Sequence, residues 1–167
     1  WERAFRVADN TYSLVALVEN PNRNARAAAV PYTFRVYDRD NVVIKTITDT
    51  TYFPPGKTFA VFEGRVTLPD TPGRTVFQFT RSPEWVQARN AKRTSDAVRV
   101  SNKRLTSLNE TPRLQAQITN TSINTIGAIE AVSVIYDSAD NAIGASRTVV
   151  TSLSPDESRG VTFTWPR

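Results

Sequence analysis

Two short clusters of oxygen-bearing side chains are the residues of this sequence best suited to chemistry. Asp38, Asp40 and Asn41 make the first cluster, and Asp137 and Asp140 make the second. Loops with several carboxylate and amide oxygens bind Ca²⁺, and neighbouring carboxylates can exchange protons with a substrate. Both clusters are small, however, and Asp and Asn also form tight turns by accepting hydrogen bonds from nearby backbone N–H groups. We therefore expect turns here, with no catalytic, cofactor-binding or metal-binding residue.

The composition excludes the commonest kinds of catalysis. The 167 residues include no His, no Cys and no Met. Ser-His-Asp and Cys-His sites cannot be built, and imidazole and thiolate metal ligands are missing from the sequence. The sequence therefore predicts a protein that is not an enzyme and uses no cofactor. The lack of Cys also suits a chain exposed to an oxidising exterior.

The chain is moderately basic, with a formal net charge of +5. Its positive residues are densest near the middle, where they include Arg89, Lys92, Arg93, Lys103 and Arg104. Two interpretations remain open, a solvated face between domains and a contact with an anionic glycan or lipid headgroups. Nucleic acid is disfavoured as a partner because Trp85 is the one stacking aromatic residue interleaved with these charges.

Three tryptophans and two glycosylation sequons are the other candidate sites. Trp1, Trp85 and Trp165 could form a platform that stacks on sugars, or each could plug the end of a domain. The sequons are Asn109-Glu110-Thr111 and Asn120-Thr121-Ser122, a pattern permissive enough to occur by chance. Asn120 also has a structural explanation, because it ends an expected strand.

The elements that position these residues are expected to be β-strands. Apolar and polar residues alternate with a period of two, β-branched and aromatic residues are frequent, and helical periodicity is nearly absent. The expected strands span residues 3–7, 12–19, 30–37, 42–52, 58–66, 74–80, 97–105, 114–119, 126–136, 143–151 and 158–165. Alternation places Val36 and Ile135 in cores. The sequence therefore predicts an all-β protein.

An internal repeat indicates two domains. A shift of 100 positions places Leu14 on Leu114, Ala16 on Ala116 and Asn20 on Asn120. The Tyr-Asp pairs at 37–38 and 136–137 differ by 99 positions, so we expect one extra residue in the second turn. We predict two tandem antiparallel immunoglobulin-like β-sandwiches, residues 1–90 and 91–167, joined by the polar run 88–95.

The repeated pattern resembles a known family. Phe34-x-Val36-Tyr37-Asp38 is similar to the signature of FxLYD-type domains, with Val in place of Leu, and Val18-Glu19-Asn20 and Pro55-Gly56-Lys57 resemble its flanking segments. The second copy diverges, with Ser133 in place of Phe and Asp156 in place of Gly. The resemblance implies small immunoglobulin-like sandwiches on bacterial and archaeal envelope proteins, often behind an N-terminal anchor. It implies no binding or catalytic residue.

These observations favour a non-enzymatic, extracytoplasmic structural or protein-interaction module of a prokaryotic cell envelope or surface assembly. The alternative is a glycan-binding β-sandwich. A protein partner or self-assembly is expected. No run of 18 apolar residues is present, so membrane attachment is expected only through an anchor upstream of Trp1.

The second repeat is expected to lack its last strand. Residues 58–66 are followed by a further strand at 74–80, whereas the counterpart of 58–66, residues 158–165, lies close to Arg167. Two explanations remain open: a native C-terminal strand that is trimmed or disordered, and a strand from outside residues 1–167 that pairs beside the second sandwich. An unpaired edge of this kind accepts added strands.

Overall fold

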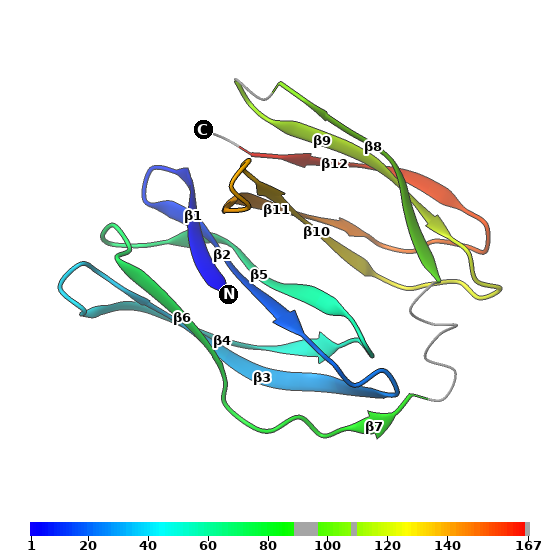
Figure 1. The fold of residues 1–167 in the computed structure, drawn as a ribbon, viewed down its shortest axis with the longest axis horizontal. Coiled ribbons are helices and arrows are strands. Elements are labelled where there is room, and N and C mark those ends of the chain that lie inside the picture. The colour runs from blue at the N-terminus through cyan, green and yellow to red at the C-terminus, as the bar shows by residue number, and fades with distance from the viewer. Residues whose placement is uncertain (89–96, 108–109, 166–167) are drawn as a thin grey trace. The chain divides into compact units, whose positions relative to one another are not determined.

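The computed structural model describes residues 1–88, 97–107 and 110–165. The chain divides into two compact units, Trp1–Ala91 and Lys92–Arg167. Both consist of antiparallel β-sheets, which confirms the all-β prediction (Figure 1). The described residues contain no helix that is long and apolar enough to cross a membrane. The predicted boundary after residue 90 lies outside the described residues.

The first unit contains two sheets. One has the order β1-β2-β5, and the other has the order β4-β3-β6 with β7 paired to the start of β3 (Figure 1). The strand bounds are β1 Glu2–Ala8, β2 Thr11–Glu19, β3 Ala25–Tyr37, β4 Val43–Phe53, β5 Thr58–Thr67, β6 Arg74–Phe79 and β7 Val86–Gln87.

The two sheets of the first unit share one hydrophobic core. Leu14 on β2 and Phe34 and Val36 on β3 are all 0% exposed, and Val61 on β5 lies in the same cluster. Successive side chains of a strand point to opposite faces, so alternating apolar residues bury one face of each sheet. The core position predicted for Val36 is therefore confirmed.

The second unit also contains two sheets. One has the order β12-β9-β8, and the other pairs β10 with β11. The strand bounds are β8 Val98–Thr106, β9 Arg113–Asn120, β10 Ile129–Tyr136, β11 Ala142–Val150 and β12 Ser158–Thr164. Ala116, Ile118 and Phe163 are buried in the core, whereas Ile135 packs against it and stays partly exposed. Ile135 lies on β10, which has one neighbouring strand, β11, whereas Val36 lies on β3, which has neighbouring strands on both sides, β4 and β6.

The two units pair corresponding strands in the same order, and several contacts coincide. Ala16 lies opposite Val61 in the first unit, and Ala116 lies opposite Val161 in the second. Both β3–β4 and β10–β11 carry a register shift just before their hairpin turn, at Tyr37 and Tyr136. The residues that the shift of 100 matches therefore lie opposite equivalent partners in the two units.

The position predicted for the extra residue of the second unit is wrong. Tyr37 lies opposite Val43 and Tyr136 lies opposite Ala142, so the two turns have equal length. The left-handed residue is Asn41 in one turn and Asp140 in the other, with φ of 65° and 59°. Since these positions differ by 99 and not by 100, the extra residue of the second unit follows the turn. The shift of 100 also places Asn41 on Asn141, but the left-handed position of the second turn is occupied by Asp140, because Asp adopts this conformation as Asn does.

Candidate functional site

Both acidic clusters form turns, as predicted. Asp38 Oδ1 accepts hydrogen bonds from the backbone N–H of Asp40 (2.9 Å) and Val42 (2.8 Å). In the second unit, Asp137 Oδ1 accepts the same pair of bonds, from Ala139 (2.9 Å) and Asn141 (2.8 Å). Within the part of the chain that the structure describes, no group of three acidic side chains gathers as a metal site would require. The carboxylates of Asp38 and Asp137 therefore stabilise the backbone of the two turns.

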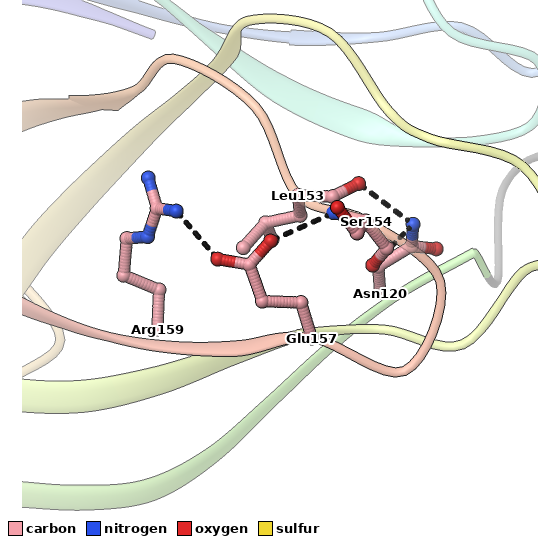
Figure 2. Close-up of polar contacts among 5 residues, drawn as sticks. All are labelled: Asn120, Leu153, Ser154, Glu157 and Arg159. Atoms are coloured by element: carbon pink, nitrogen blue, oxygen red, sulfur yellow. Dashed lines mark hydrogen bonds and ion pairs between the residues drawn. The ribbon is translucent and has the colours of Figure 1, made fainter.

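Asn120 is a buried polar residue whose side chain connects two loop segments, residues 122–124 and 153–154, and Figure 2 shows the contacts with the second of them. Its Nδ2 donates to the carbonyl oxygens of Asn124 (2.8 Å), Leu153 (3.0 Å) and Ser154 (3.1 Å). Its Oδ1 accepts the backbone N–H of Ser122 (2.9 Å). Nδ2 is the atom that N-glycosylation would modify, and Asn120 as a whole residue is 0% exposed. The sequon at Asn120 therefore serves the fold, and the sequon at Asn109 begins outside the described residues.

Asn20 has the same role in the first unit. It is 1% exposed, and its Nδ2 donates to the carbonyl oxygens of Ala25 (3.0 Å) and Pro54 (2.8 Å). Its Oδ1 accepts the N–H of Asn22 (3.0 Å). A buried amide whose nitrogen and oxygen are both hydrogen-bonded avoids the cost of an unpaired polar group, and it holds together the loops that it joins.

Glu157 is a polar residue that the sequence did not single out. Its carboxylate accepts the backbone N–H of Ser154 (2.8 Å) and a charged hydrogen bond from Arg159 (Figure 2). The Ser154 bond, followed by the Arg159 contact, holds the pKa of Glu157 below its ordinary value. Both interactions favour the ionised carboxylate. Glu157 therefore fixes the turn that precedes β12.

The tryptophans lie on separate elements. Trp1 exchanges a backbone hydrogen bond with Leu17 on β2, whereas Trp85 packs edge-on against Phe53 of β4, with ring centroids 5.7 Å apart. Trp165 follows β12 and is 6% exposed, and its indole N–H has no acceptor among the described residues. These three side chains do not form a row on one sheet face, which is the arrangement expected of a sugar-stacking platform.

The basic zone is described only in part. Arg89, Lys92 and Arg93 lie outside the described residues. Lys103 and Arg104 are exposed on β8, where the pairing with β9 is interrupted between Ser101 and Arg104. The contact with an anionic glycan therefore stays a prediction.

The most distinctive surface feature is the outer edge of β10, the edge turned away from β11. Asp137 donates its N–H to the carbonyl of Asn141 at 2.9 Å, so the backbone of Asp137 faces the β11 side. Backbone groups of successive strand residues point to alternate sides. Val132 and Val134 therefore direct their N–H and C=O groups to the outer edge. No strand in the described ranges pairs with this edge.

The equivalent edge of the first unit is occupied. Thr33 and Arg35 of β3 correspond to Val132 and Val134, and they lie opposite Gln78 and Val76 of β6. Sequence reasoning found this difference from strand order alone, and the structure adds which backbone groups it concerns.

Comparisons with protein-family models, with curated proteins and with solved structures find no significant match to the chain.

Proposed function

We propose that the chain is a non-enzymatic, extracytoplasmic structural and protein-interaction module of a prokaryotic cell envelope. The observation that carries this proposal is the use of its polar residues. Asp38 and Asp137 hold hairpin turns, and Asn20 and Asn120 join loops, so the side chains that recur in both halves serve the backbone. A chain whose recurring polar side chains specify turns is suited to act as a folded spacer or docking unit.

We further propose that each unit is an immunoglobulin-like sandwich, similar to FxLYD-type domains. In this assignment the sheet β1-β2-β5 corresponds to strands A, B and E of such a sandwich. The facing sheet β4-β3-β6 corresponds to strands C′, C and F. One core shared by both sheets supports this assignment in the first unit. The motif Phe34-x-Val36-Tyr37-Asp38 lies on β3 and its turn, where both apolar residues are buried. Tandem sandwiches of this kind on envelope proteins are the basis for the location proposed.

Protease accessibility in the native cells tests the location. Antibodies against residues 1–167 would follow the protein in intact cells, in spheroplasts and in lysed cells, each treated with protease. We expect degradation in intact cells or spheroplasts, with a cytoplasmic marker protected until lysis. Degradation of both proteins only after lysis would contradict the proposal.

A further inference from the structure

We propose that the outer edge of β10 is a strand-acceptor site. Residues 131–135 would pair with an extended apolar segment of a partner polypeptide, in the place that β6 holds on β3. This inference rests on the proposed protein-interaction function and specifies the surface that carries it. Strand addition supplies main-chain hydrogen bonds, and the side chains at alternate positions supply specificity.

The backbone of the first unit shows how an added strand would bind. The N–H of Gly73 donates to the carbonyl of Tyr37 (2.8 Å), and the N–H of Thr80 donates to the carbonyl of Pro31 (3.0 Å). These bonds flank the β3–β6 ladder at both ends. Between these two bonds, Thr33 and Arg35 lie opposite Gln78 and Val76 of β6, and the residues of β10 that correspond to Thr33 and Arg35 are Val132 and Val134. Unpaired backbone groups along a sheet edge form a template for another strand.

The side chains of the first unit show what the partner must bring. Phe77 of β6 lies opposite Phe34, with ring centroids 4.9 Å apart. Phe79 lies opposite Tyr32 and packs against Phe53, again with ring centroids 4.9 Å apart. Together these side chains cover the core at that edge.

The corresponding positions of β10 are smaller and less covered. Ser133 takes the place of Phe34 and Ala131 the place of Tyr32, and every residue of β10 is partly or fully exposed. An added strand would therefore need bulky apolar side chains opposite Ala131 and Ser133.

A second copy of this chain fits the edge less well. If two β10 strands paired antiparallel about Ser133, Ser133 would lie opposite itself and Ala131 opposite Ile135, which leaves the inward face underfilled. The bulky strand β6 is already engaged within its own sheet. The favoured occupant is therefore a strand of a different polypeptide, antiparallel to β10, with large apolar residues at two alternate inward positions.

Binding of a peptide to the isotope-labelled chain of residues 1–167 tests the proposal. The probe is a peptide of residues 74–81, which contains β6 and the two residues that follow it, and the control peptide carries serine at the positions of Phe77 and Phe79. Amide hydrogen exchange and NMR shifts report on each backbone N–H. We expect saturable binding of the probe with slowed exchange at Val132 and Val134, and weaker binding of the control.

Proline at position 134 provides the matched variant. Val134→Pro removes an outward N–H, and proline is tolerated on edge strands whose N–H faces solvent. We expect it to weaken probe binding by about tenfold, the equivalent of one or two hydrogen bonds, whereas Val134→Ala should bind like the parent chain. If Val134→Pro fails to fold, Val132→Pro removes the other outward N–H.

Three results would overturn the proposal. The first is the absence of saturable protection at residues 132 and 134. The second is a set of NMR shift changes confined to β3 and β6, which would mean that the probe has displaced β6. The third is a concentration-dependent dimer that Val134→Pro abolishes, which would assign the edge to a second copy. None of these results bears on protease accessibility in cells, so the proposed location can fail or stand separately.

Discussion

Replacing Asn120 by alanine removes a side chain that joins two loop segments of the second unit. Its two Nδ2 hydrogens serve three carbonyl oxygens, and its Oδ1 accepts the N–H of Ser122. Alanine leaves the backbone in place but removes all of these bonds. The stability lost should therefore measure what the side chain contributes to the unit.

The structure sets the expected size of the effect. At about 1 kcal/mol of net stability for each hydrogen bond, the loss of two donated bonds and of the N–H bond from Ser122 costs about 3 kcal/mol. The Ser122 hydroxyl, which also bonds to Oδ1, keeps its bond to the carbonyl of Asn124. The full penalty for stranded carbonyls does not apply, since the carbonyl of Leu153 also accepts the N–H of Ile126 at 2.9 Å. For a domain of this size, a loss of about 3 kcal/mol lowers the melting temperature by roughly 12–24 °C.

Tryptophan fluorescence assigns the change to a unit. Trp165 is buried in the second unit, so in a chain that carries Trp1→Phe and Trp85→Phe its emission reports on that unit's unfolding in urea. Asn124→Ala is the control, because Asn120 bonds to the backbone carbonyl at position 124, which alanine keeps. Asn20→Ala should destabilise the first unit instead. A loss below about 0.5 kcal/mol for Asn120→Ala, the usual range for surface substitutions, would refute the reasoning.

Three further predictions concern other residues. Val36→Asp should unfold the first unit, because an unpaired buried charge costs several kcal/mol, and Ile135→Asp should cost less since Ile135 is partly exposed; calorimetric melts of both variants check this order. Folding lowers the pKa of Glu157, so the ionised carboxylate stabilises the second unit above pH 4.5, the ordinary pKa, and this stabilisation is lost as the pH falls below that value. Glu157→Gln should therefore make the stability of the second unit depend less on pH in this acidic range, as measured by urea unfolding. An unchanged pH dependence would contradict this prediction. Gly73→Ala should destabilise the first unit, because the added Cβ would lie 2.5 Å from the carbonyl oxygen of Asp38, whereas Gly160→Ala meets nothing within 4 Å and should be tolerated in the same thermal melts.

Alternation and turn chemistry predicted much of the fold because both are local properties of the chain. Leu14 and Phe34 repeat their pattern every second residue, and their strands lie where that pattern places them. Asn120 was expected to end a strand, and it does so at the last residue of β9. The Asp turns followed from the same reasoning.

Features that depend on distant partners were missed. β7 has two residues, which is too short for any alternation to show. The first five residues of β3 were not expected to be extended, since alanine has little strand preference. In the structure Ala29 carries a φ of 50°, at the place where the pairing with β4 shifts register. Glu63 lies within the expected strand 58–66, and the sequence did not indicate that its carboxylate accepts a hydrogen bond from the hydroxyl of Tyr32 at 2.6 Å. Only the packing of the two sheets brings that pair together.

The side-chain bonds of the two buried asparagines also bear on how fast each unit opens. Asn20 reaches Pro54 and Asn120 reaches Ser154, and each contact closes a loop that spans 34 residues. Contacts across long loops require the intervening hairpin to return first, because loop closure costs entropy before the contact forms. We therefore expect these amides to engage after the transition state for folding. Their loss would shorten the lifetime of the native unit by raising its unfolding rate, while the folding rate would change little.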